Sequence, residues 1–140
     1  MIDEIREYIK ERVACVDSDL KMDKQPIASG TIPTNALEST YTVKFGSFSI
    51  DRQDTHLEVR GIVNMEIFKK LSNDLLNNYD KAFLKALDIY SNISDQVNIS
   101  QIDYIKAINN GEITPDAVDS DNNTAKFNLQ FNIVLIFAIA

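Results

Sequence analysis

The sequence contains little of the chemistry on which many enzymes and metal sites depend. Its 140 residues include one cysteine, one histidine, no tryptophan, four glycines and three prolines. A single cysteine, Cys15, cannot form an internal disulfide, so we expect a fold that does not need an oxidising compartment. Zinc sites need several Cys or His side chains at short spacings, and Cys15 and His56 cannot supply them. The sequence contains neither the Gly-x-x-x-x-Gly-Lys-Ser/Thr motif nor the Gly-x-Gly-x-x-Gly motif of nucleotide-binding loops.

Positive charge is also in deficit. Fourteen lysines and arginines stand against 21 aspartates and glutamates, which gives a net charge of −7. Proteins that hold nucleic acid by its phosphates, or dock on anionic membranes, need clustered cations. The start of the chain is charged from Asp3 onward, and the longest strongly apolar run, residues 133–140, is much shorter than the ~20 residues of a membrane-spanning helix. We therefore expect a soluble intracellular protein that does not bind membranes.

The residues that could carry out catalysis are isolated from one another. A Ser, Cys or Thr nucleophile needs a positioned base, most often histidine. His56 lies at the head of a predicted strand, and we interpret it as a surface imidazole. Cys15 lies beside the apolar face of the first predicted helix, and we interpret it as a half-buried packing residue. An enzymatic function remains an alternative only if carboxylates from different parts of the chain come together in the folded protein.

One acidic segment resembles the opening of a calcium-binding loop. Asp119, Asp121 and Asn123 have the Asp-x-Asp-x-Asn spacing of that loop. Thr124 occupies the place where glycine is needed, and Gln130 the place of the bidentate glutamate. We interpret the segment as a solvated acidic loop. The sequence predicts no catalytic residue, no cofactor and no bound metal.

Hydrophobic periodicity predicts two helices. In the first, apolar residues recur at steps of three and four from residue 2 to residue 16. In the second, which Ser72 or Asn73 could cap, residues 75–90 carry a broad apolar stripe. The stripe consists of Leu75, Leu76, Tyr79, Phe83, Leu84, Leu87 and Tyr90. Between these helices and the strands we predict two long loops, at about 17–38 and about 109–124.

Alternating apolar residues predict the strands. Residues 41–50 and 57–67 form a long hairpin, with a one-residue slip beside Gly46 that is typical of a bulge. Gly61 falls on the apolar face, where backbone can approach closely. Residues 97–99 suggest a short strand, and the last segment, 126–138, alternates most clearly. Residues 100–111 can form a helical turn or a strand, and we favour the helical turn because three isoleucines are spaced by three.

These elements together predict a single α+β domain over residues 1–140, with a mainly antiparallel sheet packed on two helices. From Ile133 onward the last strand is apolar on both faces. Either it lies in the middle of the sheet or a neighbouring subunit covers part of it, and we favour the first explanation.

The order of elements resembles the tail terminator (tail completion, or tail-to-head joining) proteins of long-tailed bacteriophages. The likeness covers most of the chain and rests on the starting segment IDEIREYIKERV, on the hairpin YTVKFGSFSI…HLEVRGIVNMEIF and on the closing segment KFNLQFNIVLIF. The two long loops depart from the family. The resemblance implies a homo-oligomeric ring, commonly hexameric, that caps the tail tube at its junction with the neck of the virion. It implies no catalytic residues and DNA that passes through the lumen without specific binding.

We expect the subunit and partner interfaces to involve the long loop, the hairpin and the last strand. The candidate interface residues are Ile32, Pro33, Phe45, Phe48, Ile136 and Phe137. The expected partners are further copies of the chain and the tail-tube and neck proteins. Two other functions remain open: another phage head–tail connector or tail-tube protein, or a small cytosolic oligomeric α+β binding domain.

Overall fold

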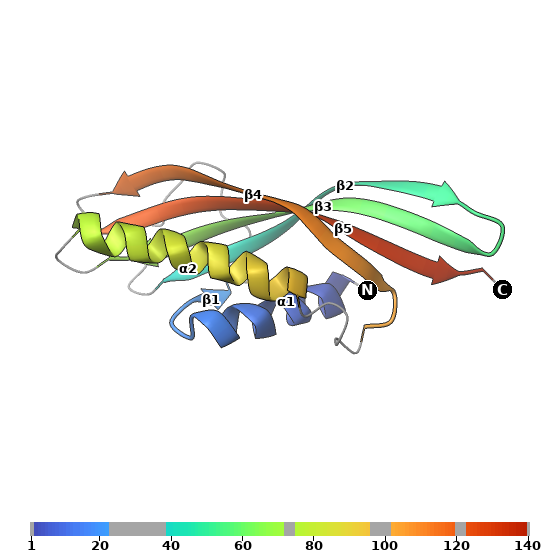
Figure 1. Ribbon diagram of the computed structural model, residues 1–140, viewed down its shortest axis with the longest axis horizontal. Coiled ribbons are helices and arrows are strands. Elements are labelled where there is room, and N and C mark those ends of the chain that lie inside the picture. The colour runs from blue at the N-terminus through green and yellow to red at the C-terminus, as the bar shows by residue number, and fades with distance from the viewer. Residues whose placement is uncertain (1, 23–38, 72–74, 96–101, 120–122, 140) are drawn as a thin grey trace.

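The computed structural model describes residues 2–22, 39–71, 75–95, 102–119 and 123–139 (Figure 1). In chain order the elements are α1 (Ile2–Val16), β1 (Lys21–Met22), β2 (Thr40–Arg52), β3 (His56–Lys70), α2 (Leu75–Asp95), β4 (Ile105–Asp119) and β5 (Thr124–Ala138). The predicted α+β class is confirmed, as are the first helix, the long hairpin and the last strand.

The strands form one sheet in the order β1-β2-β3-β5-β4. All neighbours are antiparallel except β1 and β2, which pair in parallel over two residues each. The C-terminal strand β5 lies inside the sheet and pairs with β3 along its whole length, from Thr124 opposite Lys70 to Ala138 opposite His56. The apolar C-terminal segment therefore lies within the sheet of its own chain, as expected.

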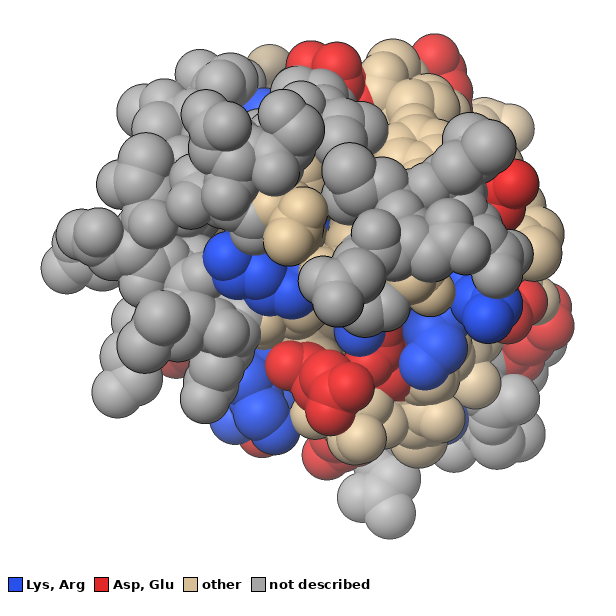
Figure 2. Space-filling view, turned by 90° about the vertical axis from the view of Figure 1, so that its left-hand side faces the viewer, with Lys and Arg blue, Asp and Glu red and all other residues tan. Residues whose placement is uncertain are grey.

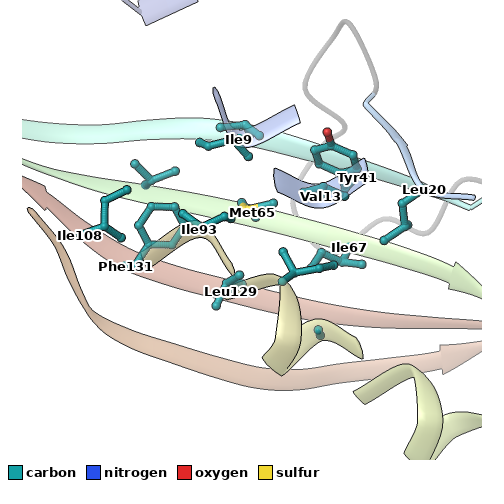
Figure 3. Packing of buried hydrophobic residues seen from close by; sticks show 14 of the residues in the cluster. Ile9, Val13, Leu20, Tyr41, Met65, Ile67, Ile93, Ile108, Leu129 and Phe131 are labelled. Carbon is teal, nitrogen blue, oxygen red and sulfur yellow. The ribbon is translucent and has the colours of Figure 1, made fainter. Parts of the chain in front are cut away.

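Both helices pack on one face of the sheet (Figure 1). The odd-numbered residues of β3 and β5 face them, and Phe127, Phe131 and Met65 are buried there. Figure 3 shows Ile9 and Val13 of α1 among these sheet residues in a continuous core. Each such aliphatic or aromatic side chain contributes about 1.5–3 kcal/mol when fully buried, so this face supplies most of the folding free energy.

Tyrosine hydroxyls join the helices to their neighbours. Tyr8 of α1 donates a hydrogen bond to the carbonyl oxygen of Ile93 in α2, with 2.5 Å between the two oxygens. Burial raises the pKa of Tyr8 to about 12. On the other side of α2, the backbone N–H of Gly111 donates to the hydroxyl of Tyr90 at 3.0 Å. The Tyr90 ring occupies the space that a side chain at position 111 would need, so glycine permits this contact.

The slip predicted beside Gly46 is confirmed. The register of β2 against β3 shifts between Phe45 and Phe48, so both aromatic side chains face the helix side of the sheet. Their rings stack with 6.1 Å between centroids. Gly61 lies on the same face, directly under the Phe48 ring.

The helical turn favoured for residues 100–111 is wrong, because β4 begins at Ile105. The spacing of three that suggested a helix has another cause. An irregularity between Ile105 and Ala107 inserts one extra residue against β5, so Ile105 and Ile108 both face the core. A bulge in a strand thus reproduces the i, i+3 spacing of a helix.

The loop predicted at about 109–124 is also wrong for most of its length, because β4 continues to Asp119. Pro115 occurs on the edge strand β4, the kind of strand to which proline is confined within sheets, because there an N–H can face away from the neighbouring strand. In the 17–38 segment, residues 21–22 form β1, and 23–38 lie outside the described residues. The cap at Ser72 or Asn73 and the strand at 97–99 also lie outside them.

Cys15 is exposed, so the prediction that it packs half-buried is wrong. At 100° per residue it lies about 200° around α1 from the buried Val13. That position points away from the sheet.

Candidate functional site

The sheet extends beyond its helices at one end (Figure 1). We call this extension the sheet arm; it comprises residues 47–52 of β2, 56–60 of β3 and 134–138 of β5. One face of the arm continues the sheet face on which the helices pack. It carries Phe48, Ile50, Leu57 and Phe137, together with Val59 and Leu135, which are buried. Ile50 is 69% exposed, and the side chains of Leu57 and Phe137 are half-buried. The described helices therefore leave part of this apolar face exposed, at Ile50.

The helix layer ends at the first turns of α1. The Arg6 guanidinium lies 5.1 Å above the centroid of the Phe45 ring, just before the arm begins. Tyr104, which precedes β4, stacks on Phe137 with 5.3 Å between ring centroids. Burial raises the pKa of Tyr104, and the nearby Glu4 carboxylate, which accepts a hydrogen bond from it, raises it further. Ile2, at the start of α1, is 40% exposed.

A second apolar surface lies on the outer face of α2. Leu84 is 59% exposed and Leu87 is 40% exposed. The inner face of the same helix is occupied by Ala82, Ala86 and Ile89, which are buried against the sheet and α1. The apolar stripe predicted for this helix is thus wider than the face that the fold buries. We call Leu84 and Leu87 the α2 leucine pair.

The opposite face of the sheet is polar and carries a buried cluster of charges. Lys126 is 1% exposed, and its Nζ lies 2.8 Å from Asp116 and 3.4 Å from Glu66. Lys44 also contacts Glu66, at 3.1 Å. The neighbouring Lys126 ammonium holds the pKa of Asp116 below its usual value, and a hydrogen bond donated by Asn128 adds to this. Pairing of this kind is what permits a lysine and a glutamate to be buried.

A groove of about 520 Å³ lies beside this cluster. Most of the residues that line it are polar or charged, of both signs, and Met65 and Leu129 also contribute. The polar ones are Lys44, Asn64, Glu66, Glu112, Thr114, Asn128 and Gln130. At one end of the molecule, acidic and basic side chains lie next to one another (Figure 2). Mixed charge and scattered amides give this face no selective attraction for an anion.

The structure places the predicted interface residues as follows. Phe45 and Phe48 lie on β2 and Phe137 on β5, all on the helix side of the sheet. Ile136 points to the opposite face, beside Glu58. Ile32 and Pro33 lie outside the described residues. The structure therefore brings Phe48 and Phe137 to one face of the arm and separates Ile136 from them.

Sequence reasoning missed Ile50 and the α2 leucine pair as candidates. Ile50 follows the apolar phase of its strand, so its sequence pattern is the same as that of a buried residue. The leucines had a usable signal, because the predicted stripe on that helix is broader than one buried face requires.

Among the described residues, no group of three or more His, Cys, Asp or Glu side chains could hold a metal ion. None of the helices that the structure describes is both long enough and apolar enough to cross a membrane.

The sequence matches no known protein-family profile and no curated protein. Among solved structures, the chain is similar to one in the "Virion of native gene transfer agent (GTA) particle". The TM-score is 0.46 at 10% sequence identity, over 95% of this chain and 92% of that chain. A TM-score at this level does not establish a common fold.

Proposed function

We propose that this chain is a structural protein of a phage-type virion. In its specific form, the proposal is a tail terminator: a closed homo-oligomeric ring, most simply of six subunits, that caps the tail tube and joins it to the neck. The resemblance in element order supports this role, since a helix, a long hairpin, a second helix and a closing strand follow one another in the described chain.

The observation that carries the proposal is the apolar face of the sheet arm, which the described residues leave exposed at Ile50. A monomer would leave Ile50 at 69% exposure beside half-buried Leu57 and Phe137. Clustered apolar surface of this kind, next to polar residues, is typical of protein–protein contacts. A ring buries such a surface once in every subunit, because each copy covers the next.

The charge of the chain is compatible with a conduit for DNA. A net charge of −7 disfavours retention of a polyanion. In the proposed ring, DNA passes through the lumen without specific binding, and no cofactor or catalytic residue takes part. The partners are other copies of the chain, the tail-tube protein and a neck protein.

The test measures assembly and tube capping with the same protein. Native mass spectrometry of the chain, alone and with its tail-tube protein, should give a closed oligomer in at least the second sample. Added to growing tail tubes, the chain should stop their elongation and appear as a ring at the tube end in electron micrographs. A matched pair of variants, Ile50→Asp and Ser49→Asp, should separate the two faces of the arm, with only Ile50→Asp preventing capping.

A stable monomer in both samples would overturn the ring and favour a small binding domain. Polymerisation of the chain into tubes of its own would instead identify a tail-tube protein.

A further inference from the structure

The two edges of the sheet are poorly suited to pairing with another copy. On the β4 edge, the register against β5 shifts at three places, Pro115 lacks an N–H, and Asn110 has a φ of 54°. On the other edge, β2 shifts register between Phe45 and Phe48, and β1 covers its first two residues. Bulges and prolines are the features by which proteins block strand addition at a sheet edge. Contact between copies is therefore expected on the faces, where the described residues expose Ile50 of the arm and the α2 leucine pair.

We propose that the sheet arm of one copy packs on the α2 leucine pair of the next copy. This inference rests on the proposed ring and names its subunit contact. Within one chain, α2 packs its inner face on the sheet, where Tyr79 and Phe83 contact Phe127. The outer face of α2 in a second copy would cover the arm in the same manner. Helix α2 of the second copy would then extend the helix layer of the first copy over the sheet arm.

The contact is heterologous, because the two surfaces are different and lie on different elements. The arm lies beyond the helix layer (Figure 1), whereas the α2 leucine pair lies exposed on a helix within that layer. Each copy thus offers one arm and one helix face. Such contacts produce a closed ring when the rotation between copies closes, and a filament when it does not.

An arginine on the arm has aspartates available opposite it on α2. The exposed Arg52 follows Ile50 by two residues on β2 and pairs with Leu57, so it shares the apolar face of the arm. On α2, Asp80 and Asp88 are exposed one turn before and one turn after Leu84. Two lysines lie on the same side of the helix: Lys81 is exposed, and Lys85 lies 4.0 Å from Asp17 of its own chain. An arm centred over Leu84 brings Arg52 within reach of an aspartate.

Disulfide trapping tests the contact directly. Two proteins are prepared in a Cys15→Ala background, one with Ile50→Cys and one with Leu84→Cys. We expect mild oxidation of their mixture to give a cross-linked dimer that neither protein gives alone. A chain that carries both cysteines should give a ladder that ends at the subunit number of the ring. Ser49→Cys is the matched control, because Ser49 is also exposed but points to the other face of β2.

Charge reversal provides a second measurement. Arg52→Glu should weaken assembly by about tenfold in the dissociation constant, since it places like charges together. Combining Arg52→Glu with Asp88→Arg should restore assembly. Both residues are exposed, so the reversals should leave the fold of each subunit intact.

The outcomes separate this inference from the proposed function. Consider a result in which native mass spectrometry gives an oligomer, alone or with the tail-tube protein, while no disulfide forms between positions 50 and 84. That result would overturn the arm-to-helix contact and leave the ring standing. Cross-linking through Ser49→Cys as efficient as that through Ile50→Cys would also overturn the contact. A monomer in both samples would overturn the contact and the ring together.

Discussion

Substitution of Gly61 by alanine should destabilise the protein through one neighbour, the Phe48 ring. A Cβ atom at position 61 would lie 2.2 and 2.4 Å from two carbons of that ring, so the ring has to leave its position. Removal of a fully buried Phe side chain costs about 3–5 kcal/mol, and Phe48 is half-buried, so its displacement should cost about 2 kcal/mol. Alanine recovers about 0.5 kcal/mol, because it restricts the unfolded chain more than glycine does. The expected net loss is about 1.5 kcal/mol.

A double-mutant cycle tests this mechanism. Phe48→Ala alone should cost about 2 kcal/mol, and adding Gly61→Ala to it should cost nothing more, because the clashing ring is then absent. The matched control is Gly46→Ala, since a Cβ there would meet Ile62 at an ordinary 3.4 Å. Its expected effect is within ~0.5 kcal/mol.

Urea unfolding followed by far-UV circular dichroism suits this measurement, because the chain has no tryptophan. All four variants should be compared with the wild type at one protein concentration. If Gly61→Ala costs as much in the Phe48→Ala background as it does in the wild type, the ring is not the cause and the reasoning fails.

Three further predictions concern other parts of the fold. Tyr8→Phe should lower stability by about 1 kcal/mol, because the buried carbonyl of Ile93 loses its donor. The pKa of Tyr8 is raised from 10.0 to about 12 in the folded state, so the wild type loses stability as the pH rises from 10.0 to about 12. In this pH range the urea midpoint of Tyr8→Phe should fall less steeply than that of the wild type. The Lys126 ammonium lowers the pKa of Asp116, so this ion pair stabilises the fold at neutral pH and its contribution is lost as the pH falls through the lowered pKa. Asp116→Asn should therefore reduce the difference between the urea midpoint at neutral pH and the urea midpoint at acidic pH. The control variant Asp80→Asn, at an exposed position, should leave this difference unchanged. Cys15→Ala should change the free energy of unfolding by no more than ~0.5 kcal/mol, since Cys15 is exposed, and a larger loss would show that the thiol packs in the core.

The sequence by itself determined the elements whose apolar period is regular. Residues 126–138 alternate without interruption, and the structure has a strand there, because successive side chains of a strand point to opposite faces. The hairpin was predictable from the same alternation, including the slip beside Gly46. The first helix was predictable because its apolar residues recur with the 3.6-residue period of a helix. Local periodicity encodes the local backbone.

The tertiary structure decided what lies at the sheet edge and what remains uncovered. β4 could not be recognised from periodicity, because its bulges place Ile105 and Ile108 three residues apart on one face. Nor does the sequence distinguish the exposed Ile50 from the buried Val43, which continue the same apolar face of β2 on either side of the bulge. That difference depends on where α1 and α2 end over the sheet. The reach of a helix layer over a sheet is set by contacts between residues far apart in the chain, and local pattern does not contain it.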